Sequence, residues 1–120
     1  MKKVNYRDIQ PFPVDRPDAS GVAARLLISR ADGAPNFSMR MFELEPGGYT
    51  PRHSHPYEHL VFVLEGEGEV LLGGAFRPLA PGDAVFVPPD GEHQFRNTGG
   101  GTLRFLCLVP NASAVSDPLK

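Results

Sequence analysis

Short strand-like runs, separated by glycine and proline at intervals of about ten residues, limit most strongly how this chain can fold. The breaks have turn chemistry, as in Pro46-Gly47-Gly48, Gly73-Gly74 and Gly99-Gly100-Gly101. No segment shows a sustained helical period with caps. The pattern predicts an all-β domain whose strands lie within the following runs: Val22–Arg30, Phe37–Leu44, Arg52–Leu64, Glu69–Leu72, Phe76–Leu79, Ala84–Pro88, Glu92–Arg96 and Thr102–Val109.

Length and charge exclude several classes of protein. A chain of 120 residues suits one domain with its own core. Its net charge of −2 and scattered basic residues argue against nucleic acid or an anionic membrane as a partner. No apolar run approaches the roughly 18 residues of a membrane span, and the first residues do not resemble a signal peptide. Because the single cysteine, Cys107, cannot form an internal disulfide, we expect a cytoplasmic protein.

We expect three parts in the chain. Residues 1–21 are polar and proline-containing, and predict an arm with at most one edge strand, placed at a dimer contact. Residues 22–110 form the β-barrel, and residues 111–120 form a frayed tail.

Side-chain alternation predicts two apolar faces on one strand. Val61 and Val63 share one face, whereas Leu60, Phe62 and Leu64 share the other. The last strand repeats this alternation, with one side formed by Leu103, Phe105, Cys107 and Val109 and the other by Leu106 and Leu108. A barrel of this size has one interior, so the second apolar face needs a cover from another sheet, the arm or a second subunit. We prefer a homodimer.

All four histidines of the chain fall into one pattern. His53 and His55 are two apart, so on a strand their rings point the same way, and His59 keeps that parity if the strand has no bulge. Glu58 has the opposite parity and should point away. His93 lies on another strand, which a barrel can bring alongside. Imidazoles that converge in this way can hold one divalent metal ion.

Two segments resemble the motifs of the cupin family. The segment Gly47-Gly48-Tyr49-Thr50-Pro51-Arg52-His53-Ser54-His55-Pro56-Tyr57-Glu58-His59, with its closing Gly66, resembles the first motif. The second motif is matched by Gly82, Pro88, His93 and Asn97, with Asp90 where the family usually has glycine. Aspartate tolerates the left-handed conformation better than most residues, so the turn can survive. The wider likeness extends from about residue 34 to residue 110.

The resemblance implies a single-domain cupin β-barrel, a double-stranded β-helix or jelly roll, with one metal ion. Cupins commonly use glutamate as the third ligand, whereas this chain has His59 at that spacing. With histidine at this position, the chain resembles the small tetra-histidine cupins, which are known with manganese bound. Imidazole by itself suits iron, copper, nickel or zinc better. We therefore rank manganese first by resemblance, followed by iron, copper, nickel and zinc, and favour an open coordination site over a closed structural one.

Other residues are candidates for the pocket. Arg40 either projects into the barrel, where it would hold an anionic substrate group, or lies in solvent, and the two alternatives are equally supported. For Cys107 a small buried hydrophobe is favoured over a reactive thiol. Phe95 and Phe105 could line the pocket mouth, although we favour ordinary packing in the core for both.

Tyr57 flanks the histidines and could donate a hydrogen bond, although most such tyrosines only pack. Asn97 could hold a ligand histidine in place or cap the turn at Asn97-Thr98-Gly99, which is at least as well supported.

Whether the chain is an enzyme stays open at this point. A metal-dependent, dioxygenase-like oxidoreductase that activates oxygen or peroxide toward a small organic substrate is the first hypothesis. No histidine remains as a general base and no G-x-S-x-G elbow is present, which favours chemistry at the metal. The alternatives are a non-catalytic, metal-stabilised module that binds a small molecule, and a Lewis-acid isomerase or lyase.

Overall fold

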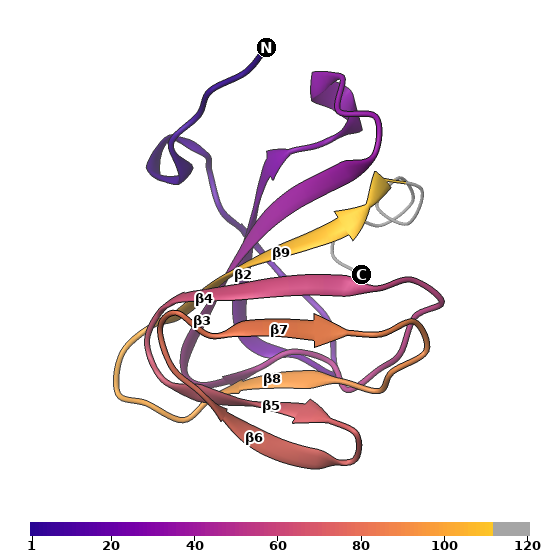
Figure 1. Cartoon of the computed structure of the whole chain (residues 1–120). Helices are drawn as coiled ribbons and strands as arrows, with labels where there is room; N and C mark the ends of the chain where they lie inside the picture. The colour runs from indigo at the N-terminus through magenta and orange to yellow at the C-terminus, as the bar shows by residue number, and fades with distance from the viewer. Residues whose placement is uncertain (112–120) are drawn as a thin grey trace.

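The computed structural model describes residues 1–111, and the expected tail lies outside them apart from Asn111. The regular secondary structure of the described part is almost wholly antiparallel β-sheet (Figure 1). Its two 3-10 helices, η1 (Tyr6–Asp8) and η2 (Arg30–Asp32), are far too short to cross a bilayer. The strands are β1 (Phe12–Pro13), β2 (Ser20–Ile28), β3 (Phe37–Tyr49), β4 (His59–Glu65), β5 (Gly68–Leu72), β6 (Ala75–Leu79), β7 (Ala84–Val87), β8 (Gln94–Asn97) and β9 (Leu103–Pro110).

One curled sheet encloses the core. The strands follow the order β6-β5-β8-β3-β9-β4-β7, with β2 on β3 and β1 on β2. In Figure 1 the sheet bends so that β4 and β7 lie over β8, β5 and β6. The buried apolar cluster joins side chains from both halves, including Val63, Val85, Val70 and Phe95. The expected all-β, single-domain barrel is confirmed.

The parity prediction for the last strand is also confirmed. Leu103, Phe105, Cys107 and Val109 are all at most 4% exposed, in keeping with their shared inner face. The central strand β3 pairs with β9 over its first eight residues, from Phe37↔Pro110 to Leu44↔Leu103. This long register fixes which face of β3 points inward, because a slip of one residue would turn every side chain over.

The prediction of one strand over Arg52–Leu64 is wrong. The strand starts only at His59, and the preceding segment is a loop attached to the sheet through the isolated bridge His53↔His93. Pro51 and Pro56 explain the interruption, since proline has no N–H to donate to a ladder. The histidines of this segment are therefore not aligned by strand alternation.

The expected break at Pro46-Gly47-Gly48 is wrong as well. Strand β3 continues to Tyr49, while the pairing with β2 jumps from Val22↔Leu44 to Ser20↔Tyr49. Four residues of β3 thus bulge out of register. Gly48 allows this close approach, because a Cβ there would lie 2.9 Å from the carbonyl oxygen of Ser20.

The arm packs against the outer face of its own sheet. Phe12–Pro13 pairs with β2. The guanidinium of Arg25 donates to the backbone oxygens of Tyr6 at 2.9 Å and Ile9 at 2.7 Å. Met41, on the outer face of β3 beside Arg25, is only 2% exposed. The outer face is therefore covered here.

The outer face of β4 stays open in the single chain. Leu60, Phe62 and Leu64 are 45%, 44% and 39% exposed, and Phe86 of the neighbouring β7 is 55% exposed. Leu60 pairs with Phe86, so these side chains are continuous across the two strands.

Gly66 lies in the turn after β4, where both its backbone conformation and the nearby backbone atoms leave no room for a side chain. Its φ is +89°, and a Cβ would lie 2.8 Å from Cα of Leu103 and would also contact the oxygen of Thr102. Gly82 has the similar φ of +93° with nothing within 4 Å of its Cβ position, which makes it a matched control.

We predict that Gly66→Ala is less stable than Gly82→Ala. Both substitutions carry the backbone cost of about 1–3 kcal/mol, and only Gly66→Ala adds a backbone collision of about 1–3 kcal/mol. Urea unfolding of the two variants measures the difference in the free energy of unfolding. Equal losses of stability in the two variants would contradict the prediction, because they would show that the turn at Gly66 accommodates a Cβ.

Candidate metal centre

Reciprocal backbone bonds bring the histidine-bearing loop to the start of β8. The N–H of His53 donates to the oxygen of His93 at 3.1 Å, and the N–H of His93 donates to the oxygen of His53 at 2.9 Å. The N–H of Asp90 donates to the oxygen of His55. Asp90 has a φ of 65°, which confirms that aspartate can take the left-handed position usually given to glycine.

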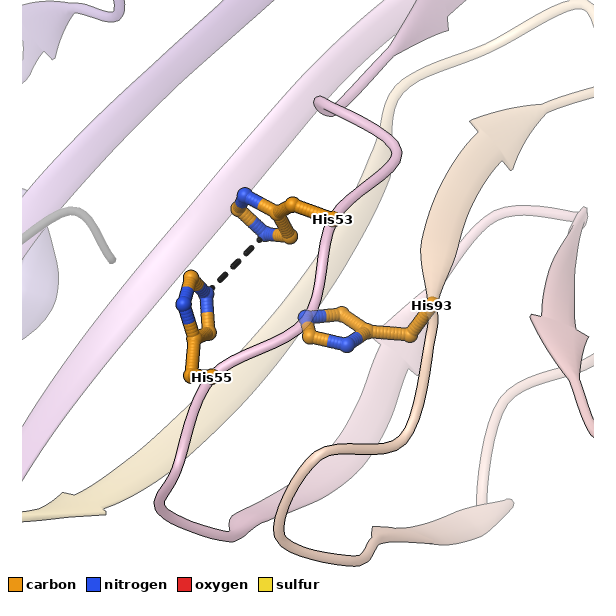
Figure 2. Close-up of side chains that lie close together, drawn as sticks. All are labelled: His53, His55 and His93. Carbon is orange, nitrogen blue, oxygen red and sulfur yellow. Dashed lines mark hydrogen bonds between the residues drawn. The ribbon is translucent and has the colours of Figure 1, made fainter.

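Three imidazoles meet in front of this junction. Figure 2 shows the rings of His53, His55 and His93 turned toward a common space. Their ligand nitrogens all lie within 4.8 Å of one another, and Nε2 of His53 is 3.2 Å from Nε2 of His55. Two nitrogens on one ion, each at about 2.0–2.1 Å, lie about 3–4 Å apart. These three residues are therefore grouped so that they can hold a metal ion.

His59 packs against this group from the first position of β4. Its ring centroid is 4.8 Å from that of His93 and 5.2 Å from that of His55. Nδ1 of His59 lies 3.4 Å from Sγ of Cys107. Its Nε2 is buried without a hydrogen-bond partner among the described residues. A buried nitrogen in this state costs free energy unless something binds it, and a metal ion fits that need.

The rings are held in the neutral form that metal binding requires. Burial, together with the nearby charges of His55 and His93, lowers the pKa of His53 to about 3. Burial likewise lowers the pKa of His59 to about 3, with contributions from His93 and Arg40. Burial also lowers the pKa of His93. At neutral pH these imidazoles keep their lone pairs available, since protonated imidazole cannot coordinate.

A backbone contact selects the tautomer of His93. Its Nδ1 lies 2.9 Å from the oxygen of Gly91, and a carbonyl can only accept, so Nδ1 carries the proton. Nε2 is then the nitrogen with the free lone pair. Glu58, which stands one place before the third-ligand position of the family pattern, is exposed and outside the histidine group.

A cavity opens beside the histidines. It holds about 470 Å³ of space not filled by atoms, including its open mouth. The described lining residues contain two arginines and no acidic residue: Val14, Arg16, Val22, Arg40, Phe42, Thr50, Pro51, His53, His59, His93, Phe95, Phe105 and Cys107.

Arg40 projects into the barrel. It is 2% exposed on the inner face of β3, and its Nη2 lies 3.1 Å from Sγ of Cys107. Of the two alternatives from the sequence, the structure shows the inward one. Cys107 is a free, buried thiol of the core, and burial raises its pKa despite the charge of Arg40. It also lies between Arg40 and His59.

The aromatic candidates lie in the core and also line the cavity. Phe95 stacks on Phe105 with centroids 4.5 Å apart, and Phe42 also stacks on Phe105 with centroids 5.6 Å apart. Tyr57 is half-buried and stacks on the ring of His55, with centroids 4.8 Å apart and planes at 7°.

Asn97 contacts the turn rather than a histidine. Its Nδ2 donates to the oxygens of Leu44 at 2.9 Å and Gly101 at 2.7 Å, and its Oδ1 accepts from the N–H of Gly99 at 2.9 Å. An amide engaged in this way holds the β8–β9 turn against β3. Of the two roles considered from the sequence, these contacts are those of the turn cap.

Sequence reasoning missed several lining residues. Phe42 shares the parity of Arg40, which was a usable signal. Thr50 stands next to the histidine loop, and its Oγ1 accepts from the N–H of Phe95 at 2.9 Å. Val14 and Arg16 come from the arm, and no local pattern indicates that the arm folds back over the barrel mouth.

Comparison with known proteins assigns the family. A family model described as a cupin domain matches residues 40–109. A 1-methylthio-D-xylulose 5-phosphate methylsulfurylase from Rhodospirillum rubrum is 39% identical over 59% of this chain and 46% of its own length. Polyketide synthase CurC from Streptomyces cyaneus is 33% identical over 98% of this chain and 82% of its own length.

The structure of the polyketide cyclase RemF from Streptomyces resistomycificus aligns with a TM-score of 0.86 and 38% identity. The alignment covers 92% of this chain and 80% of that one. This chain spans less than half the length of the methylsulfurylase. The family model, the aligned relatives and the curled antiparallel sheet agree, and the chain belongs to the cupin family.

Proposed function

We propose that His53, His55, His59 and His93 together hold one divalent metal ion, with manganese as the first choice. Three of these rings are grouped within bonding reach of one ion, and the fourth presents an unsatisfied buried Nε2 beside them. The resemblance to tetra-histidine cupins supports manganese, whereas iron, copper, nickel and zinc also suit imidazole ligands.

The reaction that this site supports best is a dioxygenase-like oxidation of a small organic molecule by oxygen or peroxide. The supporting observation is a histidine cluster that opens into a cavity whose described lining has no carboxylate. If all four histidines bind metal, no imidazole or carboxylate among the described lining residues remains to act as a general base. A bound divalent ion would supply Lewis acidity and, for a redox-active metal, electron transfer.

In this proposal the protein positions the substrate and keeps water away. The stacked rings of Phe42, Phe105 and Phe95 give the cavity an apolar wall. The contact of His93 with Gly91 and that of His59 with Cys107 hold both rings in orientation.

A second candidate is a redox-neutral cyclisation or lyase reaction that uses only Lewis acidity. The likeness to RemF, which is described as a polyketide cyclase, favours it. In such a reaction the ion would polarise a substrate carbonyl, and no oxygen would be consumed.

The four-histidine site predicts which substitutions remove the metal. In protein purified without added metal, His59→Ala should lower metal affinity by at least about 100-fold, because an imidazole ligand is lost. Glu58→Ala is the matched control and should keep the metal. Elemental analysis and competition with a chelator measure both. The four-histidine ligand set would be refuted if the Glu58→Ala variant lost its metal while the His59→Ala variant kept it.

Oxygen uptake with the metal-replete protein separates the two reactions. Protein loaded with manganese, iron or copper is incubated with small enols and phenols, with Glu58→Ala as positive control and His59→Ala as negative control. Oxygen uptake that disappears in His59→Ala supports the dioxygenase-like reaction. Metal-dependent turnover without uptake supports the redox-neutral candidate, and absence of turnover across the panel contradicts both.

We also propose that a second copy of the chain covers the open apolar face of β4 and β7, and that the protein resides in the cytoplasm. The exposure of Phe62 and Phe86 on adjoining strands supports the dimer, and the free buried thiol of Cys107 suits a reducing compartment.

The dimer should depend on this face. Phe62→Glu places a charge at its centre and should give a monomer in size-exclusion chromatography with light scattering. Tyr49→Glu is the control and should stay dimeric. Tyr49 is also an exposed aromatic residue, but it lies on β3 and pairs with β8 rather than with β4. A monomeric wild-type chain at micromolar concentration, or a dimeric Phe62→Glu, would contradict the proposal.

A further inference from the structure

We propose that Cys107 is a positioning residue for the metal site: its sulfur accepts a hydrogen bond from Nδ1–H of His59 and so turns Nε2 of that ring toward the ion. The thiol itself stays outside the ligand set. The inference goes beyond the proposed function and rests on it, since it takes His59 as a ligand of the metal. Three observations carry it: the register of the inner strands, the contacts of the sulfur, and the second ring nitrogen of His59.

The register of the sheet places Cys107 next to His59. Cys107 of β9 pairs with Arg40 of β3 on one side and with Val61 of β4 on the other. His59 lies two residues before Val61 and shares its face of β4, so it is a diagonal neighbour of Cys107, within reach of an imidazole. Cys107 and His59 are each 4% exposed. The contact between them is therefore fixed by strand pairing rather than by a loop.

The sulfur of Cys107 contacts two nitrogens at once. Nη2 of Arg40 lies 3.1 Å from Sγ, and because a guanidinium can only donate, the sulfur is the acceptor in that contact. Nδ1 of His59 lies 3.4 Å from the same sulfur. The contact with Arg40 holds the sulfur in place, and it does not require the rest of the guanidinium to be unpaired. The acceptor for His59 is thus itself held from the opposite strand.

The second ring nitrogen of His59 indicates which side of the ring the ion takes. Nε2 is buried and has no hydrogen-bond partner among the described residues, whereas Nδ1 is engaged by the sulfur. The two nitrogens of an imidazole point in divergent directions, so an ion at Nε2 and a sulfur at Nδ1 do not compete. A neutral imidazole that coordinates through Nε2 keeps its proton on Nδ1. That proton then has the sulfur of Cys107 as its acceptor.

Loss of this acceptor should weaken the metal site. Nδ1–H of His59 would be left buried without a partner, which costs free energy. The ring would also be free to turn and present either nitrogen. Removal of the outer partner of a ligand histidine typically lowers metal affinity by about 10- to 100-fold. A side chain that keeps an acceptor should therefore preserve the site, and one that only fills the space should not.

Zinc binding to variants of Cys107 tests the inference. The full chain is stripped with a chelator, and its affinity for Zn²⁺ is measured by competition with a chromophoric chelator. Cys107→Ser keeps an acceptor and should stay within about 3-fold of wild type, whereas Cys107→Val, of similar size but without an acceptor, should bind at least about 10-fold more weakly. If Cys107 only filled core space, Cys107→Val would keep the affinity and Cys107→Ser would lose it.

Val63→Ala is the control for a loss of core packing. Val63 is buried on the inner face of β4, further along the strand than His59 and outside the described lining of the cavity. Its truncation should lower the melting temperature and leave the affinity for zinc unchanged. Circular dichroism checks that each variant is folded.

His59→Ala in the same series separates the two possible failures. If the wild-type chain binds no zinc, or if His59→Ala binds zinc as tightly as wild type, the ligand assignment fails and the role of Cys107 fails with it. If His59→Ala loses zinc while a folded Cys107→Val keeps it, the role of Cys107 fails and the ligand assignment stands.

Two spectra of the wild-type chain test the inference even if the variants of Cys107 do not fold. In zinc-loaded chain with ¹⁵N-labelled histidine, the ring signals that are missing from His59→Ala should show a proton on Nδ1 and zinc on Nε2. In cobalt-loaded chain, no thiolate-to-cobalt charge-transfer band should appear in the near ultraviolet. Zinc on Nδ1 of His59, a thiolate-to-cobalt band, or a folded Cys107→Ser that binds zinc as weakly as Cys107→Val would each overturn the inference.

Discussion

The reciprocal backbone hydrogen bonds between His53 and His93 are the contact on which the rest of the site depends. They attach a proline-containing loop to the start of β8, where no regular ladder continues. A further hydrogen bond, from the N–H of Asp90 to the oxygen of His55, holds the same loop two residues beyond His53. Together they bring two histidines of one segment to a third that is far away in the sequence, and β4 then supplies His59 at its first residue.

His53, His55 and His93 lie together as expected, although the local structure expected for the segment of His53 and His55 is wrong. Strand alternation placed His53, His55 and His59 on one side, and the rings do gather on one side. However, Pro51 and Pro56 break the strand, so the grouping comes from the loop bridge to His93. The spacing of the histidines was sufficient to predict the cluster, because no histidine of the chain lies outside that pattern. That spacing could not give the backbone path.

The fold was largely predictable where alternation is long and uninterrupted. The inner face of β9, including Phe105 and Cys107, was predicted by parity and is buried. The bulge that carries β3 through Pro46-Gly47-Gly48 was not, because it depends on the close approach of β2 at Gly48. The contribution of Arg16 to the cavity was likewise missed, since docking of the arm is a tertiary event without a local signal.

Cys107 links Arg40 to His59 on the inner face of the barrel. One thiol contacts both the guanidinium and the imidazole, so the orientation of the His59 ring is linked to that of Arg40. Burial, which is the main cause that lowers the pKa of His59 to about 3, also leaves Arg40 only 2% exposed. Both properties follow from the barrel excluding water from its inner face.

The most direct test of this account is an anomalous-difference electron-density map from crystals of the metal-loaded chain. The account predicts one strong peak within about 2.0–2.3 Å of a ring nitrogen from each of His53, His55, His59 and His93. A map without a peak at this place, or one in which the ion is bound by Glu58 or Cys107 while His59 stays outside, would contradict it.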